Sequence, residues 1–145
     1  MHHINHSALV PYRAGEMYAL VADIDAYQEF LPWCDGSEVL SRDANEVTAS
    51  LHIRYGALNK SFSTRNTLHA DKKLEMDLLD GPFSHLHGVW QFQALGEVGS
   101  RISLDMDFQF SSRVLDMVAA PAFTKIADGL VEAFCQRAVD QYGKR

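Results

Sequence analysis

Hydrophobic and polar residues alternate along much of the chain after its first third. In the clearest run, residues 102–110, every second residue is Ile, Leu, Met or Phe, and the residues between them are Ser, Asp or Gln. Shorter runs of the same kind occupy residues 47–53, 62–68, 74–78 and 86–92. Because successive side chains of a strand point to opposite faces, the pattern predicts about six antiparallel strands in a sheet with one apolar and one polar face.

The first part of the chain has a different pattern. Residues 4–10 predict a short strand that Pro11 ends, and Met17, Leu20, Val21 and Ile24 then recur at helical spacing. A second short helix carries Tyr27, Phe30 and Leu31 and stops before Pro32. We therefore expect one strand and two short helices ahead of the main sheet.

The last predicted element is a long helix from Arg113 to Tyr142. Two adjacent rows of apolar residues, one starting at Val114 and one at Leu115, repeat every four positions. Pro121 is expected to kink this helix or to split off its first turn. No other predicted element is long enough to cover the apolar face of the sheet. The predicted fold is therefore α+β, a curved antiparallel sheet wrapped around a long C-terminal helix.

Composition and charge narrow the class of protein. The 145 residues are 47% hydrophobic, which predicts one domain spanning residues 1–145 with a substantial core. The formal net charge of −6 disfavours binding to nucleic-acid phosphates, so we expect no DNA partner. Two distant cysteines fit a reducing compartment, and the start of the chain lacks a signal-peptide core. No run approaches the roughly 20 apolar residues of a membrane span, so we expect a cytoplasmic protein.

Several short motifs resemble a known family. They are Ala8-Leu9-Val10-Pro11-Tyr12, Met17-Tyr18-Ala19-Leu20-Val21, Tyr27-Gln28-Glu29-Phe30-Leu31-Pro32-Trp33-Cys34, Phe62-Ser63-Thr64-Arg65-Asn66, and Gly81-Pro82-Phe83 followed by Leu86, Trp90 and Phe92. In order and spacing, over nearly the whole chain, they resemble the coenzyme Q-binding branch of the START-like helix-grip proteins, a group also labelled polyketide cyclase/dehydrase, whose bacterial members include the ribosome-association toxins called RatA.

The resemblance implies a hydrophobic tunnel that binds ubiquinone or a related isoprenoid lipid and supports respiration. The first hypothesis is therefore a carrier or chaperone for such a lipid, without catalysis and with transient membrane contact. The second, also implied by the resemblance, is a toxin that binds the large ribosomal subunit and blocks subunit joining. A cyclase or other enzyme ranks third. No cofactor is expected apart from bound ubiquinone as a ligand.

The residues expected to line the pocket are those on the apolar face of the strands and on the facing stripe of the helix. They are Phe62, Thr64, Asn66, Leu86, Trp90, Phe92, Met106, Phe108, Phe123, Ile126 and Leu130. The polar members, Thr64 and Asn66, allow two interpretations. They either bond to neighbouring backbone or a buried water, or they hold the polar end of a ligand. Arg65, between them, is expected to point outward.

A loop at residues 54–60 is a candidate gate. Tyr55 and Leu58 look exposed on either side of Gly56, so they could control the pocket or touch a membrane or partner. Ordinary packing is the alternative.

The titratable residues give little support for catalysis or a metal site. His85 and His87 share the polar strand face, but a metal site needs a third ligand. His2, His3 and His6 are expected to be mobile at the chain end. Asp105 and Asp107 lie on the polar face, where nothing raises a carboxyl pKa toward neutrality, and Cys34 has no visible activating partner. We therefore expect no metal and no enzyme activity.

Overall fold

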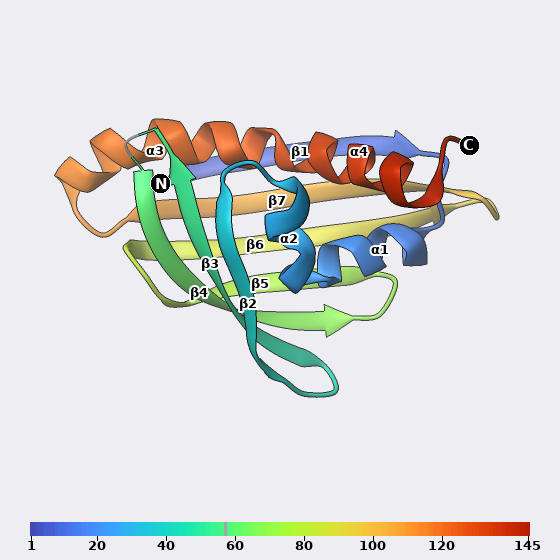
Figure 1. Ribbon diagram of the computed structural model, residues 1–145, viewed down its shortest axis with the longest axis horizontal. Coiled ribbons are helices and arrows are strands. Elements are labelled where there is room, and N and C mark those ends of the chain that lie inside the picture. Colours follow the sequence, from blue (N-terminus) through green and yellow to red (C-terminus); the bar gives the residue numbers. More distant parts are fainter. Residues whose placement is uncertain (57) are drawn as a thin grey trace.

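The computed structural model describes residues 1–56 and 58–145 and contains a seven-stranded antiparallel sheet (Figure 1). The strand order is β1-β7-β6-β5-β4-β3-β2, so strands β2 to β7 follow one another as hairpins and β1 joins the sheet beside β7. The strands are β1 (His2–Val10), β2 (Cys34–Arg42), β3 (Glu46–Tyr55), β4 (Leu58–His69), β5 (Lys73–Asp80), β6 (Phe83–Leu95) and β7 (Gly99–Phe110). The predicted alternation of strands and their antiparallel pairing are confirmed.

The helices cover one face of this curved sheet. Two helices, α3 (Arg113–Asp128) and α4 (Leu130–Tyr142), follow one another along the sheet, and Figure 1 shows them running across its concave side. Between β1 and β2 lie α1 (Ala14–Ala22), the 3-10 turn η1 (Ile24–Ala26) and α2 (Tyr27–Phe30). The predicted arrangement of a curved sheet around a long C-terminal helix, with short helices after the first strand, is confirmed.

The interruption of the C-terminal helix lies at Gly129, whereas the sequence pointed to Pro121. Helix α3 continues through Pro121 without interruption, and Gly129 separates it from α4. Proline cannot bond to the carbonyl four residues earlier, which here belongs to Met117, a 73% exposed residue. Water can satisfy that carbonyl, so the proline is tolerated. Glycine has a low helix propensity, so the helix is interrupted most easily at Gly129.

The first turns of α3 do not take part in the core. Val114, Met117 and Val118 are 73%, 73% and 61% exposed, although the stripe pattern had placed Val114 and Val118 on the buried side. Figure 1 shows this end of α3 extending past the ends of the strands. Burial begins at Ala119 and continues through Phe123 and Ile126, where the helix lies over the sheet.

The N-terminal histidines are held in place, so the expectation that they are mobile is wrong. Strand β1 begins at His2, two residues earlier than predicted, and pairs with β7 along its whole length. His2 contacts Asp116 at 2.8 Å and His6 contacts Asp128 at 2.8 Å, both on α3. On the opposite face of β1, His3 contacts Asp107 at 2.6 Å. These pairs join β1 to the helix above it and to the neighbouring strand.

The residues on either side of Gly56 and Ala57 in the candidate gate belong to the paired strands β3 and β4. Tyr55 at the end of β3 pairs with Leu58 at the start of β4, and Gly56 has a φ of 58°. Ala57 lies outside the described residues. Tyr55 is 39% exposed, but Leu58 is 4% exposed and belongs to the main apolar core, so its predicted exposure is wrong.

No helix of the described residues is long and apolar enough to cross a membrane.

The hairpin generates a stability prediction. Leu58→Ser should lower the free energy of unfolding by about 2–5 kcal/mol, because it removes a buried side chain and leaves a cavity. The matched variant Tyr55→Ser, on the other side of the same turn, should lower it by less than about 1 kcal/mol. Urea unfolding followed by circular dichroism measures both. Equal effects of the two variants would contradict the assignment of Leu58 to the core.

Candidate functional site

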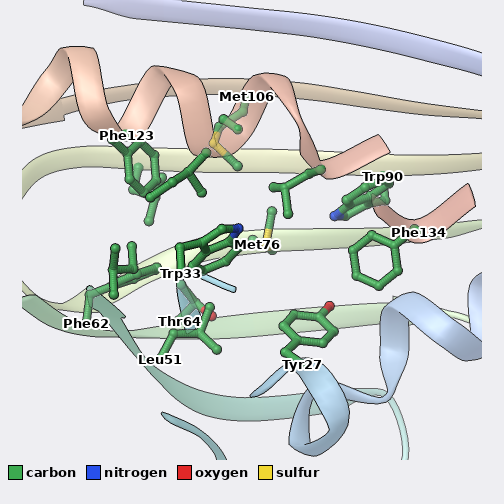
Figure 2. Close-up of a pocket in the computed structure, with 15 residues that line it drawn as sticks. Tyr27, Trp33, Leu51, Phe62, Thr64, Met76, Trp90, Met106, Phe123 and Phe134 are labelled. Atoms are coloured by element: carbon green, nitrogen blue, oxygen red, sulfur yellow. The ribbon is translucent and has the colours of Figure 1, made fainter. Parts of the chain in front are cut away.

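An apolar cavity lies between the concave face of the sheet and the two C-terminal helices. Figure 2 shows side chains from the sheet, from α3 and α4, and from the segment around α2 converging on it. The fifteen lining residues are Tyr27, Trp33, Leu51, Ile53, Phe62, Thr64, Met76, Leu86, Trp90, Met106, Phe123, Ile126, Ala127, Leu130 and Phe134. Eleven of them have no O–H or N–H group in the side chain, and the other four contribute only the hydroxyls of Tyr27 and Thr64 and the two indole N–H groups, so the wall is largely apolar.

Strand alternation explains how the sheet supplies its part of the wall. Leu86 and Trp90 lie on the same face of β6, and Met76 and Met106 lie on the same face of the two adjoining strands. The helix supplies the opposite wall because Phe123, Ile126 and Leu130 are spaced three and four residues apart and therefore share one side.

Aromatic contacts define the two ends of the cavity. At one end, the ring of Phe134 packs edge-on against Trp90 and Tyr27, with centroid distances of 5.3 and 5.4 Å. At the other end, Phe62 and Phe123 pack edge-on with their ring centroids 6.4 Å apart. Figure 2 shows the indole of Trp33 projecting between these two ends. Trp33 follows α2, so the short helix fixes a side chain in the middle of the cavity.

The enclosed space is small for a ring-bearing ligand. The cavity volume is about 60 Å³, whereas a cavity of roughly 150 Å³ is known to bind benzene. A substituted ring therefore fits only if some lining side chains move. The side chain of Trp33 is one candidate, because it is only half-buried, although its backbone is held by a 2.9 Å hydrogen bond from the Arg54 amide to the Trp33 carbonyl oxygen.

Thr64, in the cavity wall, and Asn66, behind it, are joined by a hydrogen bond. Asn66 Nδ2 donates to the carbonyl oxygen of Val47 and to Thr64 Oγ1, both at 3.1 Å. A carbonyl oxygen can only accept, so the contact with Val47 fixes which end of the Asn66 amide faces the strand. Thr64 Oγ1 thus accepts from Asn66, and its own hydroxyl proton remains available as a donor. Of the two residues, Thr64 lines the cavity and Asn66 orients it.

The titratable groups nearest the cavity are held in their neutral forms. Burial raises the pKa of Tyr27, whose hydroxyl donates to the carbonyl oxygen of Val21. Burial also raises the pKa of the Cys34 thiol, which donates to the Gly36 carbonyl oxygen. Tyr27 is the one lining residue with a titratable side chain. At neutral pH the described wall therefore presents neither a base nor a thiolate nucleophile.

Of the histidines and aspartates singled out from the sequence, His3, His87, Asp105 and Asp107 lie on the other face of the sheet. The side chains of Asp105 and Asp107 are 54% and 40% exposed and both contact His3. His87 contacts Asp77 at 2.7 Å. Among the described residues, no three His, Cys, Asp or Glu side chains are grouped so that they could hold a metal ion. Arg65 also points outward, as predicted, and pairs with Glu46 at 3.3 Å.

Eight of the eleven residues expected to line the pocket do so. They are Phe62, Thr64, Leu86, Trp90, Met106, Phe123, Ile126 and Leu130. The other three are buried but stand outside the wall. Phe92 packs edge-on against Tyr18 of α1 at 5.7 Å, and Phe108 packs against Phe123 at 4.7 Å. Asn66 lies behind Thr64, and neither Tyr55 nor Leu58 of the candidate gate lines the cavity.

Seven lining residues were not anticipated. Leu51, Ile53 and Met76 belong to strand faces that the alternation had already identified as apolar, and Ala127 and Phe134 belong to the helix stripe, so the signal for these five was present. Tyr27 and Trp33 are different. They come from the short helix and the turn after it, where no periodic pattern indicates which side chains point inward.

The whole chain resembles proteins of one family. The family model described as polyketide cyclase/dehydrase and lipid transport matches residues 10–135. The ribosome association toxin RatA of Pseudomonas aeruginosa is 45% identical over 141 residues, which cover 97% of this chain and 98% of that protein. The mitochondrial coenzyme Q-binding protein COQ10 of Drosophila melanogaster is 30% identical over 132 residues, which cover 88% of this chain and 54% of that protein.

Solved structures agree with this relationship. An aromatase/cyclase from a Streptomyces species superposes with a TM-score of 0.85 at 16% identity, over 99% of both chains, which shows a common fold. An 18 kDa protein from Caulobacter crescentus has a TM-score of 0.77 at 30% identity, again over 99% of both chains. With the helix-grip fold and the apolar cavity described above, these matches establish that the chain belongs to the START-like polyketide cyclase/dehydrase and lipid transport family.

Proposed function

We propose that this protein binds a lipid with an isoprenoid tail and an oxygen-bearing ring, ubiquinone or a close relative, and carries it without catalysing a reaction. The observation that carries the proposal is the apolar cavity between the sheet and α3–α4, into which one uncommitted hydroxyl proton, that of Thr64, can be directed. The family description includes lipid transport, and one relative is named a coenzyme Q-binding protein.

The apolar wall suits the tail of such a ligand. Each CH₂ group removed from water contributes about 0.8 kcal/mol, so a few buried isoprene units supply most of the affinity. The tail needs no directional contact, which agrees with a wall built from Phe, Leu, Ile and Met side chains. Because the cavity encloses about 60 Å³, binding must be coupled to movement of the wall, and we expect a correspondingly slow association rate.

The hydrogen-bonded pair of Thr64 and Asn66 suits the quinone ring of such a ligand. A quinone carries carbonyl oxygens that only accept hydrogen bonds, and Thr64 can donate one. Asn66 supports this role from behind, because accepting a hydrogen bond strengthens the hydroxyl as a donor.

The enzyme hypothesis has less support. The aromatase/cyclase with the similar fold is 16% identical, a level that speaks for the fold alone. General acid–base chemistry needs a group that exchanges protons near neutral pH, and Tyr27, whose pKa is raised by burial, is the titratable side chain in the wall.

Contact with a membrane belongs to the same proposal. A carrier of so apolar a ligand must collect it from a lipid phase. The exposed Val114, Met117 and Val118 at the start of α3 form an apolar surface on the helix that covers the cavity. We propose that this end of α3 makes the transient contact.

Association with the ribosome is the second candidate. It is favoured by the relatives named ribosome association toxin, at 45% identity in Pseudomonas aeruginosa and 37% over 145 residues in Escherichia coli. We propose the large subunit as the partner, in the cytoplasm, with blocked subunit joining as the outcome. A net charge of −6 means that such binding uses a ribosomal protein or a local patch in place of broad phosphate contacts.

The lipid proposal predicts saturable binding of a short-tailed ubiquinone in equilibrium dialysis. Thr64→Val keeps the shape of the side chain and removes the donor, so the dissociation constant should rise by about three- to tenfold, the effect of one hydrogen bond. The control is Thr67→Val, the same change on the same strand outside the cavity wall, which should leave the constant unchanged. Absence of binding to the unmodified protein would refute the proposal. Equal effects of the two variants would show that Thr64 does not donate a hydrogen bond to the ligand.

The ribosome proposal predicts that the protein sediments with large ribosomal subunits in a sucrose gradient and not with small subunits. Because the chain is acidic, raising the salt concentration from 50 to 200 mM should weaken the association far less than the roughly thousandfold loss expected for a protein with many phosphate contacts. Protein that stays at the top of the gradient under both conditions would exclude this function.

A further inference from the structure

The sheet has a gap in its side-chain layer on the floor of the cavity. Gly88 lies on β6 between Leu86 and Trp90, on the face that these two residues share, and it is buried. Any other residue at this position would direct a side chain toward the cavity. The glycine is therefore a place where the backbone of the sheet itself can be reached from the cavity side.

Two methionines occupy this gap. Met76 on β5 and Met106 on β7 are the register partners of Gly88 on its two sides, and both line the cavity. A Cβ atom at Gly88 would lie 2.6 Å from the Met76 methyl carbon and 3.5 Å from that of Met106. The ends of both thioether side chains thus converge over the glycine and fill the volume that a side chain would take.

Methionine is suited to a floor that moves. Its side chain is unbranched, has three rotatable bonds and packs favourably against aromatic rings through its sulfur. The other side chains around Gly88 are less adaptable, because Leu86 is branched and Trp90 is locked edge-on against Phe134. Since the cavity of about 60 Å³ is too small for a ring, the methionine ends are the groups whose displacement adds room at the lowest cost.

We propose that Met76 and Met106 form a displaceable floor, and that the ring of the ligand takes their place against the backbone of Gly88. This assignment rests on the proposed function in naming a ring-bearing lipid. It makes Gly88 the residue that determines specificity for a flat ring, because a planar group can lie on the bare sheet where a side chain at position 88 would hold it away.

Methyl-labelled methionine provides a direct test by NMR. Titration with benzene, and separately with a short-tailed ubiquinone, should shift the methyl signals of Met76 and Met106. The signal of Met17, buried in α1 outside the cavity wall, and that of Met117, 73% exposed, should not move. Each signal is assigned by a single Met→Leu variant. Ligand binding that leaves the Met76 and Met106 signals in place would overturn the proposal, and so would failure of both ligands to bind.

Substitutions at Gly88 test the same point by affinity. Gly88→Ala should fold normally, because its methyl group is too close only to the flexible end of Met76 and makes ordinary contacts with Met106, but it should weaken ring binding by about tenfold or more, the effect of roughly 1.4 kcal/mol. Gly36→Ala is the control, because its Cβ would make an ordinary 3.8 Å contact outside the cavity.

The two proposals fail in different ways. If benzene binds and shifts the methionine signals but ubiquinone does not bind, the ubiquinone proposal is refuted and the displaceable floor is supported. If Gly88→Ala binds ubiquinone with unchanged affinity, the displaceable floor is refuted and the ubiquinone proposal stands.

Discussion

The apolar face of a strongly curved sheet has to be shielded from water, and this requirement determines the rest of the structure. The strands β5, β6 and β7 present a continuous row of buried side chains, and α3 and α4 cover them. An uninterrupted helix curves only gently, so it cannot follow a strongly curved sheet at constant distance. The bend at Gly129 reduces the mismatch, and the space that remains between helix and sheet is the cavity.

The same requirement explains which parts of the molecule could be predicted from sequence. A residue of a regular strand or helix has its direction set by its neighbours, so the pattern located Trp90, Met106, Phe123 and the other regular positions of the wall. Regular spacing does not say where an element ends relative to its partners. The exposure of Val114 and Val118 depends on how far α3 extends past the sheet, a property of the assembled fold.

Short and irregular segments were the other source of error. Trp33 follows a helix of four residues, and no local rule directs its indole into the cavity. The sequence pattern predicts a loop at Leu58, but the register of β3 with β4 places it in the core. The pattern put Thr64 and Asn66 on the apolar face together. Their different roles, one facing the cavity and the other behind it, depend on the hydrogen bond of Asn66 to Val47, which joins two strands.

The two proposed functions use different parts of the protein. A lipid ligand would occupy the interior, between the sheet and the C-terminal helices, whereas a ribosomal partner must contact the outside. Two surfaces contribute no residue to the cavity wall. They are the polar face of the sheet, with its paired histidines and aspartates, and the exposed start of α3. Both activities could therefore reside in one chain, and a variant of the cavity need not affect contacts on the surface.

Intermolecular nuclear Overhauser effects between a short-tailed ubiquinone and the methyl groups of the protein test the central claim most directly. If the ligand lies between helix and sheet, its protons should give cross-peaks to the methyl groups of Thr64, Ile126 and Leu130, which line the cavity from opposite sides. Cross-peaks confined to exposed methyl groups such as those of Val114 and Val118 would place the ligand on the surface and contradict the account.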